Sequence, residues 1–454
     1  MRVPGPPRHY PGEHLIAMRR DPLRFLPRLA RDYGDVARLR FGKQDLFLVS
    51  HPDAIRDILV THSRQFKKGK GLEGAKRLLG EGLLTSEGDF HLRQRRLAQP
   101  AFHRERVAAY AQIMVDSAEQ MSARWIRGRE VDMAREMSRL TMTIVGRTLF
   151  GSEVEGEAEE IGEAIASTLT MFNHVFLPFA EVLDRLPFGP GPRFRRARER
   201  LDQTIYRMIE EHRSAGQDRG DLLSMLILAQ DDEDHGARMT DEQIRDEAIT
   251  IFLAGHETTA NALTWTWYLL SQHPDVERKL HDEVDGVLSG RAPTYDDMHS
   301  LPYTRMVFAE SMRLYPPAWA IGRRALEEFD AMGYTIPKRA VVLMCPYIVQ
   351  RDARFFPDPE RFDPDRWTPD AQANRPRFAY FPFGGGNRIC IGEQFAWMEG
   401  VMLVAQLSQK WKMRLDSSAR IEVQPLITLR PRHGMPMILE KRDKSGTVSA
   451  RKTL

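Results

Sequence analysis

The sequence is poor in cysteine and in long apolar runs. Only two of its 454 residues are cysteines, Cys345 and Cys390, and they lie far apart. A disulfide framework is therefore excluded, and the chain fits a reducing compartment. The opening residues, 1–7, contain no apolar segment, and no run elsewhere is long enough to span a bilayer. We expect a soluble, cytoplasmic protein without a transmembrane anchor.

An excess of charge of one sign is also missing. Lys and Arg total 66 and Asp and Glu total 63, which leaves a formal net charge of +3. That charge is too small to indicate a nucleic-acid partner. No Gly/Ser-rich or Pro-rich linker interrupts the interior. We therefore predict a single domain over residues 13–440, after a Pro-rich segment (1–12) and before a basic, disordered tail (441–454).

Helical periodicity dominates what is present. A capping-box sequence begins at Thr240, and an apolar pattern continues from it to Gln272, before Pro274. Such a helix would be about 45–50 Å long at 1.5 Å per residue, enough to cross the molecule. Short strands are expected in a hairpin at 36–50 and in a terminal hairpin at 420–440. The prediction is a mainly α fold with small β-sheets (α+β).

Two further segments carry less specific patterns. Residues 66–88 are rich in Gly and Lys, which favours a long functional loop. A breaker at Pro187 separates two helical patterns, and the earlier one carries an apolar stripe. That stripe either roofs a pocket or packs in the core; it consists of Phe172, Val175, Phe176 and Phe179.

The most specific pattern surrounds Cys390. Phe383, three glycines (384–386) and Arg388 precede it, and a helical pattern follows. A helix N-terminus lowers the pKa of a nearby thiol and suits it to ligating a metal. The glycines let the backbone lie against a bulky planar partner, and Arg388 can reach an anionic group on it. A cysteine outside such a pattern is more often an inert buried thiol. We interpret Cys345, which lies in a short apolar run, in this way.

A second pattern lies at the centre of the long helix, where Ala254 and Gly255 precede Glu257, Thr258 and Thr259. Glycine costs about 1 kcal/mol relative to alanine in a helix. Threonine hydroxyls compete for backbone carbonyls. We therefore expect a local distortion that makes a groove for a small ligand. The alternative is a threonine pair packed in a core helix.

Together these segments resemble the signature sequences of the cytochrome P-450 superfamily. Residues 383–392 match its haem-binding loop, Phe-Gly-x-Gly-x-Arg-x-Cys-x-Gly, and residues 254–259 match its oxygen-binding groove, Ala-Gly-x-(Asp/Glu)-Thr-Thr. The resemblance extends from about residue 4 to residue 440. It implies the fold of that superfamily, with the long central helix over haem b (iron protoporphyrin IX).

The resemblance also implies roles for individual residues. Thr258 would donate a hydrogen bond to bound dioxygen, and Glu257 would help to relay protons. His91 stands where the family has Trp, and Arg95 stands at the family's Arg; both can donate to a haem propionate. The implied cofactor-binding residues are His91, Arg95, Ala254, Arg323, Phe383, Arg388 and Cys390, the last as the iron ligand.

Two further groups follow from the same resemblance. Glu310 and Arg313 share a helix face and would form a structural network with Arg361 of the segment Pro359-Glu360-Arg361-Phe362. Apolar side chains fall where the family contacts its substrate, which favours a lipophilic one; they are Leu84, Ala254, Ala318, Trp319 and Ile427.

The implied function is that of a bacterial haem-thiolate monooxygenase. It would insert one oxygen atom from O2 into a C–H or C=C of a fatty acid, terpenoid or carotenoid-like substrate. Electrons would come from a ferredoxin or flavodoxin with its reductase. Four arginines either form a docking patch for that carrier or a solvated basic face; they are Arg93, Arg96, Arg104 and Arg106. The alternatives are a peroxide-driven peroxygenase, a peroxide-rearranging enzyme of the same fold and a non-enzymatic haem sensor, which usually lack the acid–alcohol pair.

Overall fold

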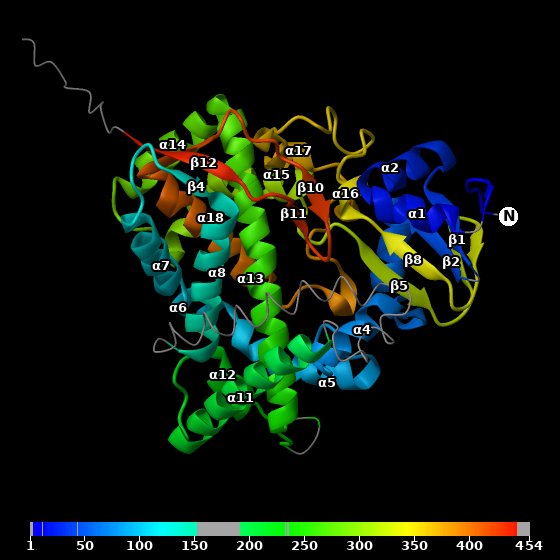
Figure 1. Ribbon diagram of the computed structural model, residues 1–454, viewed down its shortest axis with the longest axis horizontal. Helices are drawn as coiled ribbons and strands as arrows, with labels where there is room; N and C mark the ends of the chain where they lie inside the picture. Colours follow the sequence, from blue (N-terminus) through cyan, green and yellow to red (C-terminus); the bar gives the residue numbers. More distant parts are fainter. Residues whose placement is uncertain are drawn as a thin grey trace, which may run out of the picture.

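The computed structural model describes residues 3–442, except for residues 11, 43, 152–190, 232, 234 and 235. The stripe before Pro187 lies outside the described residues, as does most of the predicted tail. The protein is largely helical, with small sheets at its edges (Figure 1). The predicted fold class is confirmed. In the described part of the chain, no helix is long and apolar enough to cross a membrane.

Helix α13 (Asp241–Gln272) runs through the middle of the molecule (Figure 1). The capping box predicted at its start is present. The Thr240 hydroxyl accepts from the Gln243 amide at 3.2 Å, and the Gln243 side chain accepts from the Thr240 amide at 3.1 Å. The helix packs against α8 (Met133–Phe150), α15 (Pro302–Leu314) and α18 (Glu393–Ser408). Its length follows from near-continuous burial, which tertiary packing stabilises.

Other helices surround this centre. In chain order they are α1 (Glu13–Arg20), α2 (Pro22–Tyr33), α3 (Pro52–Arg56), α4 (Lys70–Leu79), α5 (Gly88–Ala98), α6 (Arg104–Ala109), α7 (Ala111–Ala123), α11 (Gly191–Ala215), α12 (Leu222–Leu228), α14 (Pro274–Leu288), α16 (Pro346–Val349) and α17 (Pro369–Gln372). Helix α4 lies in the segment 66–88, so the prediction of an irregular loop there is wrong. Four glycines between residues 69 and 80 hid its amphipathic pattern.

The largest described sheet lies at the right of Figure 1, beside α1 and α2, and has the strand order β1-β2-β8-β5-β3. Its strands are β1 (Val36–Phe41), β2 (Gln44–Val49), β3 (Phe66–Lys68), β5 (Ile321–Ala325) and β8 (Val341–Met344). Only β2 and β8 are parallel among these pairs. The predicted hairpin at 36–50 is confirmed. Cys345, just after β8, is 1% exposed and packs in the core, as predicted.

The smaller sheets are formed mainly by the C-terminal third of the chain. They comprise β6 (Phe329–Ala331) with β7 (Tyr334–Ile336), β10 (Val423–Pro425) with β11 (Leu429–Pro431), and β4 (Glu130–Asp132) with β12 (Pro436–Lys441) and β9 (Trp411–Leu415). The terminal hairpin predicted over 420–440 is therefore only half right, because β12 pairs with β9 and β4. Lys441 ends β12 and Arg442 pairs with Asp285 at 2.6 Å, so these two residues, predicted as the start of a disordered tail, are held in the fold.

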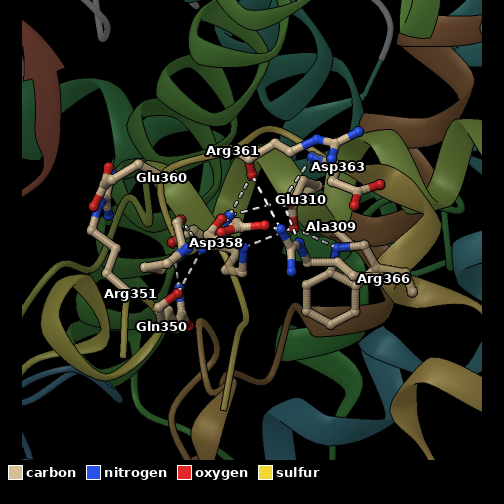
Figure 2. A network of polar contacts seen from close by, with 12 residues as sticks. Ala309, Glu310, Gln350, Arg351, Asp358, Glu360, Arg361, Asp363 and Arg366 are labelled. Atoms are coloured by element: carbon tan, nitrogen blue, oxygen red, sulfur yellow. Dashed lines mark hydrogen bonds and ion pairs between the residues drawn. The ribbon is translucent and has the colours of Figure 1, made fainter. Parts of the chain in front are cut away.

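A buried ionic network joins α15 to the segment that leads toward Cys390 (Figure 2). The Glu310 side chain is fully buried and accepts two hydrogen bonds of 2.8 Å from Arg313. It also accepts from Arg366 Nε at 2.9 Å and from Trp367 Nε1 at 2.8 Å. The Asp363 amide donates the fifth bond, at 3.1 Å. A buried carboxylate is tolerated only when its lone pairs are satisfied in this way.

The third side chain of this network is Arg366, so the prediction of Arg361 is wrong. Arg361 is exposed and contributes its backbone carbonyl, which accepts from Arg313 Nη2 at 3.1 Å. The sequence holds two similar segments five positions apart, Pro359-Glu360-Arg361-Phe362 and Pro364-Asp365-Arg366-Trp367. In the segment 364–367, the aromatic residue is Trp367, whose indole also donates to Glu310. This extra donor explains why that segment, and not 359–362, places its arginine beside Glu310.

We expect Arg366→Ala to destabilise the fold by about 3–5 kcal/mol, because it leaves a buried carboxylate short of a cationic donor. The matched variant Arg361→Ala keeps the backbone carbonyl and should change the free energy of unfolding by no more than about 0.5 kcal/mol. Urea unfolding of both variants measures the difference. Equal losses of stability would contradict this assignment.

A second buried carboxyl group, Glu399 on α18, has no such partners. Its side chain is 0% exposed, and its carboxylate oxygens make no hydrogen bond of good geometry to a described residue, although the Thr259 hydroxyl is close enough to influence them. Burial raises the pKa of Glu399 to about 8, although the nearby Thr259 hydroxyl acts in the opposite direction. The folded protein therefore keeps this carboxyl protonated at neutral pH, where an unfolded chain would ionise it.

This difference makes stability depend on pH. Between the unfolded pKa near 4.5 and the folded pKa of about 8, folding takes up a proton, so Glu399 lowers stability progressively as pH rises through that window. The neutral variant Glu399→Gln lacks this cost. We expect its stability relative to wild type to increase between about pH 5 and pH 8 in urea unfolding. A difference that is constant across this range would show that Glu399 does not titrate there.

Candidate functional site

Cys390 lies in a short loop between a turn of 3-10 helix (Gly386–Arg388) and α18. Its amide donates to the Phe383 carbonyl at 3.0 Å, which closes the loop. The Phe383 ring packs on Trp397 with ring centroids 5.7 Å apart. Although it is set deep among protein atoms, the Cys390 residue is exposed. The closing hydrogen bond and the Phe383 contact hold the loop, and with it the position of Cys390.

The glycines of this loop are required by neighbouring protein atoms. A Cβ on Gly386 would lie 1.9 Å from the Leu59 carbonyl oxygen, and one on Gly385 would lie 2.6 Å from the Phe378 ring. Gly386 also has a φ of +67°, which side chains rarely adopt. The predicted reason, contact with a planar partner, is therefore not needed to explain these two positions. They let the loop pack directly on the residues that follow α3.

Opposing effects act on the Cys390 thiol. Burial raises its pKa to about 11, while a hydrogen bond from the Gly392 amide and the charge of Arg95 favour the thiolate. The expectation of a lowered pKa is wrong for the protein alone, because burial outweighs the helix terminus. A bound metal ion reverses the balance, since coordination removes the thiol proton.

Basic side chains gather at this loop from four parts of the chain: the loop itself, α5, β3 and β5. Arg95 on α5 donates to the Ile389 carbonyl at 2.7 Å. Arg388 donates to the Ser86 carbonyl at 2.8 Å and to Glu87 Oε2 at 2.5 Å. The other members of this basic cluster are His91 on α5, Arg323 on β5 and Lys68 on β3, and Lys68 lies in electrostatic reach of both Arg323 and Arg388.

These groups depress one another's pKa. Burial, then the charges of Arg388, Lys68 and Arg95, lower the pKa of His91 to about 3. Burial and Arg388 lower the pKa of Arg323 to about 10. Burial and the charges of Arg388 and Arg323 also lower the pKa of Lys68. Such crowding of like charges is unfavourable unless an anion compensates it.

Lys68 is the member of the basic cluster that the sequence did not reveal. Its ammonium group donates to the Leu83 carbonyl at 2.9 Å and to the Leu84 carbonyl, and its amide donates to Glu87 Oε1 at 2.7 Å. The three-residue strand β3 is too short to show an alternating pattern. The basic run at residues 67–70 was the one available indication.

The arrangement fits a haem group. Glu87 pairs with Arg388 at 2.5 Å and compensates part of the positive charge of the basic cluster. The two propionates of haem would compensate more of it, and Cys390 would supply the single protein ligand to the iron. Among the described residues, no group of three or more His, Cys, Asp or Glu side chains is placed to hold a metal ion by itself. The predicted cofactor-binding residues His91, Arg95, Arg323 and Arg388 do lie close together.

The centre of α13 combines an exposed backbone with two anchored hydroxyls. Ala254 is exposed, although the residues before it are buried. Thr258 Oγ1 donates to the Ala254 carbonyl at 2.6 Å, and Thr141 Oγ1 donates to the His256 carbonyl at 3.1 Å. The helix is continuous here, so the predicted distortion is not observed. The two carbonyls accept from these hydroxyls while they also take part in the backbone hydrogen bonding of the helix, so the backbone stays helical.

His256 and Gly255 have structural surroundings. The His256 ring lies 3.0 Å from the Ser138 hydroxyl on α8, and burial lowers its pKa to about 4. A Cβ on Gly255 would lie 3.1 Å from Val145, so glycine permits the close approach of α8 and α13. Neither residue is placed to ligate a metal with Cys390.

Glu257 is tied to the β10–β11 hairpin. Its Oε1 accepts from the Thr428 hydroxyl at 2.6 Å, and that hydroxyl accepts from Asn261 Nδ2 at 3.1 Å. Successive helical residues point about 100° apart, and Glu257 and Thr258 accordingly bond to different partners. The sequence pattern identified the pair but could not show that Thr428 holds the acid.

Three of the predicted substrate-contact segments meet at this hairpin. Ile427, at its tip, is 39% exposed. The hairpin also receives a bond from Trp265 of α13, whose indole donates to the Leu429 carbonyl at 2.9 Å. The Leu429 amide donates to the Pro317 carbonyl at 3.0 Å, next to the half-buried Ala318. The hairpin, α13 and the segment around residue 318 therefore share one location.

The two remaining predicted pocket residues are placed differently. Trp319 packs against the apolar cluster beneath β1 and β2, and its indole donates to the Leu426 carbonyl at 2.8 Å. It therefore supports the hairpin from outside. Leu84 is half-buried in the segment 80–87, which docks on the first half of α13 through the Leu83 amide and Glu247.

The four arginines considered for partner docking are largely engaged within the protein. Arg93 and Arg96 pair with Asp231, and Arg106 pairs with Asp218 at 2.6 Å. Arg104 donates to the Tyr295 hydroxyl at 3.0 Å. These contacts compensate much of the positive charge, which favours a structural role over a docking patch.

Comparisons with known proteins agree with this site. The profile of the family described as Cytochrome P450 matches residues 3–435. The chain is 41% identical to Cyclooctatin synthase of Streptomyces melanosporofaciens, covering 92% of this chain and 91% of that protein. It is 36% identical to Pentalenene oxygenase of Streptomyces avermitilis, covering 92% of each.

A solved structure is similar over the whole fold. The crystal structure of the cytochrome P450DA heme domain superposes with a TM-score of 0.89 at 26% sequence identity, covering 98% of each chain. The agreement therefore extends from the Cys390 loop to the N-terminal sheet. The chain belongs to the cytochrome P450 family of monooxygenases.

Proposed function

We propose that this cytochrome P450 monooxygenase inserts one oxygen atom from O2 into a C–H or C=C of a lipophilic substrate. The substrate class that we favour is the terpenoids. The observation that carries the proposal is the exposed Cys390 loop beside a buried cluster of basic groups. Support for the substrate class comes from the apolar residues at the hairpin and from the relative named for pentalenene, a terpene hydrocarbon. Fatty acids and carotenoids are the next classes to test.

Haem b, when bound, would activate dioxygen and carry out the oxygen transfer. The chain supplies its environment. His91, Arg95, Arg323, Arg388 and Lys68 would hold the propionates through charge-assisted hydrogen bonds. Cys390 would supply a thiolate, which favours cleavage of the O–O bond by donating electron density.

The residues of α13 would manage protons. Thr258 carries a hydroxyl held on the Ala254 carbonyl, from which it can turn to donate a proton to dioxygen. Glu257 is adjacent to Thr258 in the sequence, but successive helical residues point about 100° apart, so we expect ordered water to connect the two. The apolar residues Ala254, Ala318 and Ile427 would exclude bulk water and leave a lipophilic substrate no charge to pair with.

Electrons would come from a separate ferredoxin or flavodoxin with its reductase. The protein would act in the cytoplasm, in agreement with its two unpaired cysteines.

The test is spectroscopic. The purified protein is reduced and treated with carbon monoxide, and the difference spectrum is compared for wild type, Cys390→Ala and the matched variant Cys345→Ala. We expect the far-red Soret band of thiolate-ligated haem in wild type and in Cys345→Ala but not in Cys390→Ala. Folded wild-type protein without haem, or the same band in Cys390→Ala, would refute the proposal. Titration with terpene hydrocarbons, fatty acids and carotenoids, following the haem spectrum, then distinguishes the substrate classes.

Replacement of Lys68 should loosen the haem. Lys68→Met removes one basic group that would lie near the propionates, and we expect haem transfer to apomyoglobin to become roughly tenfold faster, a loss typical of one charge-assisted contact. The control is Lys67→Met, because alternate residues of β3 point to opposite faces. Equal rates for the two variants would show that Lys68 does not contact the cofactor.

Replacement of Thr258 should uncouple electron use from product formation. Thr258→Ala removes the hydroxyl that donates the proton, and we expect the ratio of hydrogen peroxide to oxidised substrate to rise roughly tenfold or more. Thr264→Ala is the matched control, since Thr264 makes the same bond to the carbonyl four residues earlier, at 2.7 Å, but is buried. Peroxide and product are measured with the best compound from the titration. An unchanged ratio in Thr258→Ala would remove Thr258 from the mechanism.

A further inference from the structure

A groove of about 670 Å³ lies away from the Cys390 loop, between α7, β4 and α8. These elements pack side by side at the left of Figure 1. The groove has the size of a typical small-molecule site. Five arginines line it: Arg124, Arg129, Arg135, Arg139 and Arg147.

The acidic residues of the groove are mostly committed to local bonds. Asp132 accepts from the Ala134 amide at 3.1 Å and from the Met435 amide at 2.8 Å. Glu136 accepts from the Trp125 indole at 2.8 Å. These donors are neutral, so Asp132 and Glu136 keep their negative charge, and Glu130 is exposed. Three carboxylates line the groove together with five arginines. The lining therefore has an excess of positive charge.

Four of the five arginines have no salt bridge or side-chain hydrogen bond to any residue that the structure describes; they are Arg124, Arg129, Arg135 and Arg139. Arg147, at the α8 end, differs in donating to Ser117 and Gln120. Arg135 and Arg139 are four residues apart on α8, a spacing at which like charges destabilise a helix. Within the described part of the chain, these four groups have no anionic partner, whereas an anion in the groove would provide one.

The rest of the lining is apolar. It includes Met121, Trp125, Val131, Leu140 and Met142. Trp125 is anchored, because its ring packs on Trp411 with centroids 5.7 Å apart and its indole is bonded to Glu136. A ligand for this groove thus needs clustered negative charge and an apolar or flat body.

The groove is far from the candidate haem site. Glu119, beside the lining residue Gln120, pairs with Lys410 at 3.1 Å, just beyond the end of α18. Cys390 lies before the start of that helix. Since α18 has 16 residues, its two ends are about 24 Å apart at 1.5 Å per residue. A ligand in the groove would not contact the cofactor.

We propose that this groove binds a small molecule with two or more adjacent phosphate groups. Guanidinium groups match phosphate oxygens in a planar, two-pronged geometry. Several of them around one concave surface suit a compact oligophosphate better than a flat membrane or a long nucleic acid. The body of the ligand, a nucleoside or an isoprenoid chain, rests on the apolar lining.

The test uses the haem-loaded protein at low ionic strength. Pyrophosphate, ADP and farnesyl diphosphate are titrated by calorimetry into wild type and into Arg135→Gln/Arg139→Gln. The matched control is Arg196→Gln/Arg200→Gln, which removes two exposed charges at the same spacing on α11. We expect saturable binding of one molecule per chain, weakened by about tenfold or more in the groove variant and unchanged in the control.

Comparison of the three probes identifies the source of the phosphates. Tighter binding of ADP than of pyrophosphate indicates a nucleotide, and tighter binding of farnesyl diphosphate indicates a lipid diphosphate. The carbon monoxide spectrum confirms that each variant is folded. The proposal is overturned if no probe binds saturably below about 1 mM, if both variants weaken binding equally, or if only anionic lipid vesicles bind in a groove-dependent manner.

Discussion

A carboxylate without access to water can be kept in a fold only if donors surround it, and Glu310 meets that condition. Its donors come from α15 itself and from the segment 363–367, which lies far from α15 in the sequence. That segment is otherwise short of regular structure, so the ionic network substitutes for a strand ladder or a helix. The chain from this network to Phe383 and Cys390 is then held at both ends, by Glu310 and by α18. The position of the candidate iron ligand depends on this constraint.

The basic cluster on the other side of the Cys390 loop is also held together by contacts between distant segments. Four short segments, namely β3, α5, β5 and the Cys390 loop itself, bring basic groups to one place, and Glu87 compensates only part of their mutual repulsion. The propionates of haem would compensate more of this charge. Burial favours the neutral thiol of Cys390, and coordination to iron would remove its proton. Part of the stability of the fold is thus expressed only in the holoprotein.

The sequence predicted the parts of the structure that local patterns encode. The capping box at Thr240 located the start of α13, and the spacing of glycine and aromatic residues identified the loop around Cys390. It failed where the deciding contact is distant. Arg361 and Arg366 stand in similar local patterns, and only the fold shows which one is buried beside Glu310. Lys68 belongs to a strand of three residues, and the tight fit of Gly386 against Leu59 joins positions over three hundred residues apart.

The link between Glu257 and the β10–β11 hairpin has a consequence for selectivity. Thr428 holds the acid, and Ile427 beside it is exposed where a substrate would press. Because the two residues are neighbours on one tight turn, a molecule that displaces the hairpin also moves the group that holds the carboxylate. If Glu257 relays protons as proposed, the shape of the substrate would then influence the supply of protons. A poorly fitting compound would be oxidised inefficiently for a reason separate from its affinity, since its binding would disturb the acid while leaving the iron site intact.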